Sequence, residues 1–206
     1  MPAPRLAECD RVLVVEGFDD LLFYAELLES LGNDGRVFIK QMGGKGNLTS
    51  EALEAFLSPP LRAEKRAIGV IADADTSARG TAQSLASRLS AITGQRVEVG
   101  AWTDGRPRTG LFVVPSATRA GEIESLVWEA WSNDPAHAAE RACIEAYLAC
   151  MSAAGHSAHS PDKGRVGALL AVLHDEDPRL GPGARARAFD FARPEFASLV
   201  AFLRAF

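Results

Sequence analysis

Two apolar segments of the sequence end abruptly at carboxylates, and this pattern constrains the fold more than any other feature. Residues 11–15 (RVLVV) lead into Glu16, and residues 66–72 lead into Asp73 and Asp75. Short, β-branched apolar segments followed by a helical pattern are typical of parallel strands that are buried on both faces. The carboxyl ends of such strands form the edge where open α/β sheets bind ligands. We therefore expect an α/β fold with acidic side chains at its ligand-binding edge.

Strand and helix patterns alternate along the first hundred residues. Strands are predicted at 11–15, 36–41 and 66–72, and helices at 18–31, 48–57 and 78–92. This order predicts a Rossmann-like parallel sheet with flanking helices and right-handed crossovers. The apolar segments 97–102 and 110–115 flank the turn-forming residues 103–108, which predicts a hairpin-like pair at one edge of the sheet.

The remainder of the chain has a helical pattern. Helices are predicted at about 122–131, 135–153, 163–174 and 194–205. Between the last two, the Gly- and Arg-rich residues 181–187 predict either a mobile linker or a well-packed loop. We expect residues 1–118 to form the α/β core and residues 119–206 to form a helical extension packed on it, within one continuous domain.

The composition excludes some classes of protein. The 206 residues are 47% hydrophobic, with a net charge of -5 and a pI near 5.4, so the chain is not a generally basic nucleic-acid binder. A polyanionic partner must therefore meet a local patch or a bound metal. The N-terminus lacks a basic region followed by an apolar stretch, and no segment approaches the ~20 apolar residues of a membrane helix. We expect a cytoplasmic protein with no membrane partner, and the sequence leaves a homo-oligomer open.

The strand-end acids impose a strand order if they share a cation. Adjacent parallel strands lie about 4.8 Å apart, so Glu16 converges with Asp73 and Asp75 only if the first and third strands are neighbours, which gives the order 2-1-3. Asp20 follows Glu16 by about one helical turn and can face the same site. Clustered carboxylates need a divalent cation to offset their repulsion. The alternative is that the acids only cap a helix and form an ordinary turn.

With these residues the sequence resembles the Toprim domain, the α/β module of topoisomerases, bacterial primases and several nucleases. The resemblance covers residues 11 to about 115 and depends on Val14-Val15-Glu16-Gly17 and on Asp73-Ala74-Asp75. The whole chain resembles a stand-alone group of Toprim-like proteins of unknown function, in which a C-terminal helical cap recurs. The resemblance implies a Toprim sheet and a Mg²⁺ or Mn²⁺ cofactor.

Further features are similar to the branch of overcoming-lysogenisation-defect nucleases. That branch carries E-x-x-x-D at the first site, matching Glu16 and Asp20, a later glutamate matching Glu124, and a downstream lysine matching Lys163. The chain departs from the branch in two ways. It lacks the phosphate-binding loop of the ATPase domain that the larger members carry, and Glu122 stands where the nuclease pattern often has a small hydroxyl residue.

The resemblance implies metal-dependent phosphoryl transfer with defined acidic roles. Glu16, Asp73 and Asp75 would hold the cation, and Asp20 would complete its ligands directly or through water. Glu124 would help to hold a second ion, as in two-metal sites. Glu16 could act instead as a general base or acid.

Two basic residues have roles in the same chemistry. Lys163 would offset the charge of the pentavalent phosphorus. Lys45 lies in the glycine-rich segment MGGKGN, so that its side chain and backbone N–H groups such as that of Gly44 could hold a phosphate. The alternative for Lys45 is a surface lysine in a flexible loop.

The predicted function is hydrolysis of DNA or RNA phosphodiesters by a nuclease. One alternative is a non-catalytic nucleic-acid-binding or assembly module, because a fold does not determine a function. Another is a small nucleotide-binding or nucleotide-processing enzyme, which suits the acidic pI. In each case the expected partner is a nucleic acid or a nucleotide.

Overall fold

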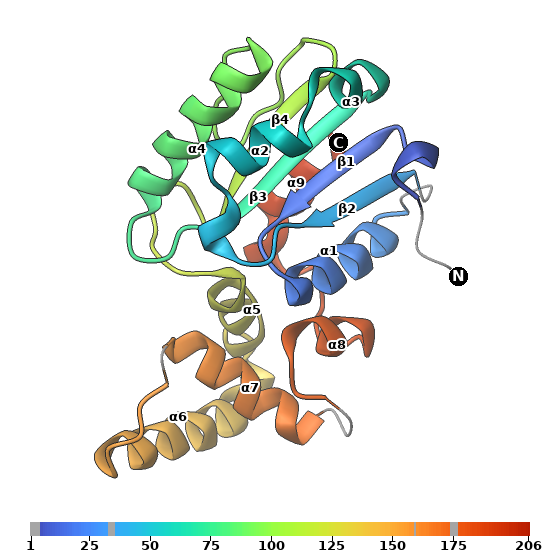
Figure 1. Ribbon diagram of the computed structural model, residues 1–206. Helices are drawn as coiled ribbons and strands as arrows, with labels where there is room; N and C mark the ends of the chain where they lie inside the picture. The colour runs from blue at the N-terminus through green and yellow to red at the C-terminus, as the bar shows by residue number, and fades with distance from the viewer. Residues whose placement is uncertain (1–4, 33–35, 159, 174–176) are drawn as a thin grey trace.

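A computed structural model describes residues 5–32, 36–158, 160–173 and 177–206. For Lys45 it describes the backbone only. A four-stranded parallel sheet with the order β2-β1-β3-β4 forms its centre (Figure 1). The strands are β1 (Arg11–Val15), β2 (Val37–Gln41), β3 (Ala67–Asp73) and β4 (Arg108–Val114). The α/β class and the predicted order 2-1-3 are both confirmed.

The described residues also form nine α-helices and four short 3-10 helices. The α-helices are α1 (Phe18–Ser30), α2 (Ser50–Phe56), α3 (Pro59–Glu64), α4 (Ala78–Thr93), α5 (Ile123–Ser132), α6 (Ala138–Ala153), α7 (Pro161–Leu173), α8 (Leu180–Arg185) and α9 (Ala197–Arg204). The 3-10 helices are η1 (Leu6–Glu8), η2 (Lys45–Asn47), η3 (Pro135–His137) and η4 (Pro194–Phe196). The predicted end of α7 at residue 174 lies outside the described residues. None of the described helices combines the length and the apolar composition needed to cross a membrane.

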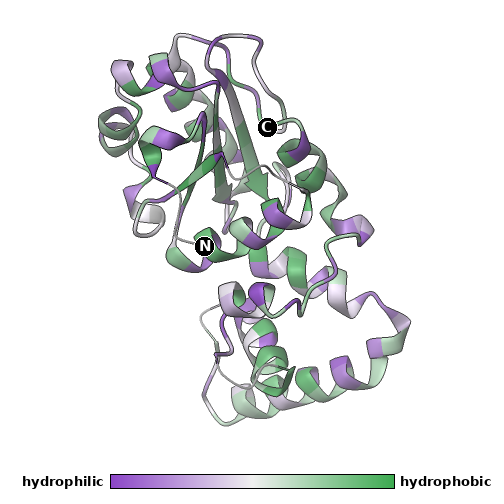
Figure 2. Ribbon diagram, turned by 90° about the vertical axis from the view of Figure 1, so that its right-hand side faces the viewer, coloured by the Kyte–Doolittle hydropathy of each residue, from purple (hydrophilic) through white to green (hydrophobic). Residues whose placement is uncertain are grey.

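The sheet separates two hydrophobic cores, because successive strand residues point to opposite faces. On β1, Leu13 and Val15 belong to the core that includes residues of α1, α5 and α9, whereas Val12 and Val14 belong to the core beneath α2 and α4. The strands are mostly hydrophobic, as Figure 2 shows, although β2 ends in Lys40 and Gln41. The result is a three-layer sandwich in which both sheet faces are covered, as the apolar strands predicted.

The hairpin-like pair predicted beside β4 is reduced to a short antiparallel contact, in which Trp102 bridges to Gly110 and Thr103 donates its backbone N–H to the carbonyl of Thr109 at 2.9 Å. Residues 97–102 form no strand; Val99 and Trp102 make only isolated bridges, to Leu111 and Gly110 respectively. Strand β4 instead pairs in parallel with β3, and α4 forms the crossover between them. Trp102 donates its indole N–H to the carbonyl of Phe202 at 3.0 Å and stacks on that ring at 4.7 Å between centroids. Trp102 therefore packs on α9 of the helical extension and does not belong to a strand.

The helical extension contains one helix that sequence patterns did not predict. Residues 180–185 form α8, which packs on α1, so the mobile-linker interpretation of residues 181–187 is wrong. A Cβ at Gly181 would lie 2.6 Å from Cβ of Leu22 and 3.1 Å from the carbonyl oxygen of Asp19. Glycine therefore allows the two helices to approach closely. Helices α6 and α7 project away from the sheet beyond α5 (Figure 1).

Candidate metal centre

The end of β3 is joined to the start of α5 by backbone contacts. Asp75 and Gly121 exchange two backbone hydrogen bonds of 2.7 Å, and the Asp73 carboxylate accepts a third bond of 3.0 Å from the N–H of Ile123. Gly121 has a φ of +133°, and a Cβ there would lie 2.6 Å from Oγ of Ser125. Only glycine suits this turn. The turn brings the first residues of α5 beside the carboxyl end of β3.

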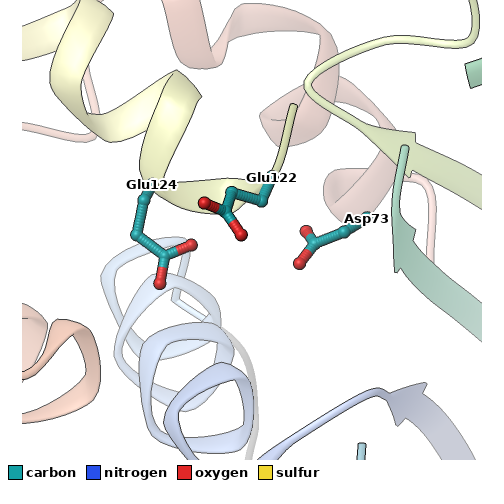
Figure 3. A group of neighbouring side chains, drawn as sticks. All are labelled: Asp73, Glu122 and Glu124. Atoms are coloured by element: carbon teal, nitrogen blue, oxygen red, sulfur yellow. The ribbon is translucent and has the colours of Figure 1, made fainter. Parts of the chain in front are cut away.

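Three carboxylates converge as a result, and we call them the carboxylate cluster. Asp73, Glu122 and Glu124 each place one oxygen within 4.8 Å of the others (Figure 3). Magnesium binds six oxygens at about 2.1 Å, so its ligand oxygens lie about 3.0 Å apart when adjacent and about 4.2 Å apart when opposite, which is the scale of the cluster. Glu124 is nine-tenths buried, and its Oε2 has no hydrogen-bond partner among the described residues. A buried carboxylate oxygen of this kind suits a cation ligand.

The environment of the cluster disfavours negative charge on its carboxylates. Burial raises the pKa of Asp73 well above its usual range, and the charges of Glu16, Asp20 and Glu124 raise it further. Burial also raises the pKa of Glu124, to about 7, although Lys163 opposes this shift. A divalent cation would reverse both effects, because it stabilises the ionised carboxylates. The donor set therefore fits a hard cation such as Mg²⁺.

Lys163 and Ser160 reach the cluster from the start of α7. The Lys163 ammonium donates to Oε2 of Glu122 at 2.6 Å, and the Ser160 hydroxyl donates to the other oxygen of the same carboxylate. Burial lowers the pKa of Lys163, but the hydrogen bond to Glu122 and the charge of Glu124 outweigh it and raise that pKa above its ordinary value. Lys163 is therefore a stable cation beside the carboxylates.

Glu16 lies next to the cluster but faces the other side of the sheet edge. It follows Val14 in the strand alternation, and Val14 packs beneath α2 and α4, whereas Asp73 follows Ile71 on the α1 side. Its Oε1 accepts the backbone N–H of Asp73 at 3.0 Å. Glu16 therefore contacts β3 but is not one of the three clustered carboxylates. That Glu16 and Asp73 share a cation stays a prediction.

The remaining predicted residues lie around this edge in different ways. Asp20 accepts the backbone N–H of Gly17 at 2.7 Å, which is the helix-capping role considered as an alternative, and burial raises its pKa. The backbone of Asp75 serves the junction with Gly121, and its carboxylate is outside the cluster. Gly44 donates its N–H to the carbonyl oxygen of Glu16 at 2.8 Å, which places the glycine-rich loop at the site. The prediction for the Lys45 side chain falls outside the described atoms.

Glu122 is the cluster residue that sequence reasoning missed. It is the N-cap of α5 with extended backbone angles (φ -139°, ψ -178°), and Glu124 lies in the first turn of the same helix. The sequence signal was the G-E-I-E segment at residues 121–124, in which two acids alternate as they do in Asp73-Ala74-Asp75. The resemblance drew attention to Glu124 alone.

Comparison with known proteins yields one match. A family model described as "Protein of unknown function (DUF3226)" matches residues 10–206, which include every residue of the cluster. No curated protein and no solved structure gives a significant match to the chain.

Proposed function

The chain belongs to the DUF3226 family of proteins of unknown function, and we propose that it is a Mg²⁺-dependent phosphoryl-transfer protein of the Toprim type, a nuclease that hydrolyses DNA or RNA phosphodiesters. The observation that carries this proposal is the carboxylate cluster at the carboxyl end of β3 with Lys163 beside it. Ligand binding in open α/β sheets occurs at this edge. The resemblance of the segments around Glu16 and Asp73 to Toprim motifs supports the same chemistry.

The residues have distinct roles in the proposed reaction. Asp73, Glu122 and Glu124 would hold the cation, which would supply Lewis-acid stabilisation of charge on a phosphate. Lys163, which is half exposed beside these carboxylates, would donate to a non-bridging phosphate oxygen. Glu16 is held by the N–H of Asp73 and accepts a proton from the attacking water as general base.

The test is hydrolysis of plasmid DNA, single-stranded DNA and RNA with Mg²⁺ or Mn²⁺, with a chelator as the blank. Glu124→Gln should slow hydrolysis by at least about a hundredfold, because loss of a ligand removes several kcal/mol of transition-state stabilisation. The matched control is Glu129→Gln on the same helix, where Glu129 pairs with Arg119 at 2.6 Å away from the cluster. The control should keep the wild-type rate. Binding of nucleic acid without turnover under every divalent cation would refute the proposal in favour of a non-catalytic module.

A further inference from the structure

A cavity of about 340 Å³ opens at the sheet edge on the side opposite the carboxylate cluster. Its apolar wall is formed by Leu48, Ala72 and Leu85, which all belong to the core beneath α2 and α4. Glu16 also lines it, and the same carboxylate accepts the N–H of Asp73. The cavity and the cluster are therefore joined through Glu16 and the end of β3.

One face of α4 turns a polar stripe toward this cavity. Ser77, Thr81, Ser84 and Arg88 line it. Their spacing of four, three and four residues keeps them on one side of a helix. The neighbouring residues Ala78, Ala82, Leu85 and Leu89 supply the buried stripe of the same helix. The polar stripe is therefore additional to the residues that pack the helix on the sheet.

The polar groups of the stripe keep hydrogen-bonding capacity for a ligand. The side-chain hydroxyls of Ser77 and Ser84 make no hydrogen bond within the described part of the chain. Arg88 donates from Nη1 to the carbonyl of Leu48 at 2.6 Å, which fixes the guanidinium at the cavity and commits only one of its five N–H donors. The cavity thus offers one fixed cation, hydroxyls and one carboxylate.

This combination selects a ligand by its chemistry. A phosphate suits the guanidinium and the hydroxyls, since charge-assisted bonds to arginine are strong. A bare phosphate does not match the whole cavity as well as a sugar phosphate does, because a sugar hydroxyl can add a hydrogen bond to the Glu16 carboxylate, which accepts more than one donor. An uncharged sugar would leave Arg88 without an anion. A phosphorylated sugar meets both requirements.

We infer that this cavity is a binding subsite for the sugar-phosphate of one nucleotide unit, either a free nucleotide or a unit of a nucleic-acid chain. This inference rests on the proposed function and specifies its substrate. The bound unit would lie next to the phosphodiester that reaches the carboxylate cluster, because Glu16 borders both places. Arg88, Ser84 and Ser77 would then be binding residues rather than metal ligands.

The experiment measures binding of adenosine 5′-monophosphate, ribose 5-phosphate, inorganic phosphate and a 5′-phosphorylated tetranucleotide to the full chain by calorimetry. Arg88→Gln should weaken adenosine monophosphate binding at least about tenfold, and Ser84→Ala several-fold. The control Arg96→Gln, whose side chain is 89% exposed beyond the end of α4, should bind as the wild type does. Mn²⁺ binding should be the same in all three variants, because the metal ligands lie elsewhere.

Each result supports or overturns the inference that the cavity binds a nucleotide unit. Tighter binding of the tetranucleotide than of the mononucleotide identifies a polymer unit, and the reverse identifies a free nucleotide. Equal binding of inorganic phosphate and of the sugar phosphates would overturn the inference, as would unchanged affinity in both Arg88→Gln and Ser84→Ala. Ser84→Ala remains decisive if Arg88→Gln loosens the contact with Leu48 and fails to fold. Lost nucleotide binding in Arg88→Gln without hydrolysis of any substrate would refute the proposed function and leave the subsite standing.

Discussion

Replacement of Glu124 by glutamine should stabilise the metal-free protein at alkaline pH. The folded state raises the pKa of Glu124 from 4.5 to about 7, chiefly by burial. Between these pH values the folded protein binds the proton more tightly than the unfolded chain does, so stability falls as the pH rises. The loss is complete above about pH 7, where it amounts to about 3 kcal/mol. Glutamine keeps the shape of the side chain and carries no charge, so Glu124→Gln avoids this loss.

Thermal unfolding in a chelator at pH 5 and pH 8 measures the effect. A change of 1 kcal/mol shifts the melting temperature of a domain of this size by about 2–4 °C, so Glu124→Gln should melt about 6–12 °C above the wild type at pH 8. At pH 5 the difference should shrink to about 1 kcal/mol, or about 2–4 °C, because the unfolded carboxyl is already mostly ionised there while the folded one is protonated. Addition of Mg²⁺ at pH 8 should reverse the order, since the cation stabilises only the ionised carboxylate. Destabilisation by Glu124→Gln at pH 8, or a shift independent of pH, would refute the argument; Glu129→Gln is the control.

Three further outcomes are expected. Asp73→Asn should abolish the rise in melting temperature with Mg²⁺ or Mn²⁺, whereas Asp75→Asn should retain most of it, because asparagine tolerates the φ of +46° at that position and the carboxylate lies outside the cluster. Glu16→Gln should lower hydrolysis about a hundredfold with little loss of nucleic-acid binding in a gel-shift assay. In chemical denaturation, Gly181→Ala should cost about 2 kcal/mol or more through its clash with α1, while Gly167→Ala, which meets no atom within 4 Å, should be neutral or stabilising.

The strand arrangement follows from local features of the sequence. The apolar segments before Glu16 and Asp73 are long enough and β-branched enough to form strands, and their acidic ends required adjacent strands. The register that pairs Val14 with Val70 satisfies this requirement. The patterns at 97–102 and 181–187 did not predict the observed structure. Trp102 and Gly181 contact helices that are distant in the sequence, and local periodicity carries no information on such contacts.

The composition of the site depends on contacts that sequence separation hides. Glu122 reaches Asp73 only because Gly121 pairs with Asp75 across more than forty residues. The separation of Glu16 from Asp73 follows from strand alternation once each face of the sheet is assigned to its helices. Assigning the faces requires knowledge of the side on which each crossover helix packs, which only the folded chain shows. The sequence therefore predicts which edge of the sheet carries the acidic residues. It does not predict which of these residues lie on each side of the sheet.

The contact between Lys163 and Glu122 leads to the last prediction, in which affinity and activity change in opposite directions. Lys163 neutralises one of the three carboxylates that would hold the cation, at a distance of 2.6 Å. Lys163→Gln removes this charge, so Mn²⁺ should bind several-fold more tightly, by about 1 kcal/mol for a half-exposed pair. Hydrolysis at saturating metal should nevertheless fall at least about tenfold, because the transition state loses one charged hydrogen-bond donor. Manganese titration and single-turnover kinetics on the same preparation measure both quantities. Weaker metal binding in Lys163→Gln would show that the lysine organises the carboxylates instead of competing with the cation for Glu122.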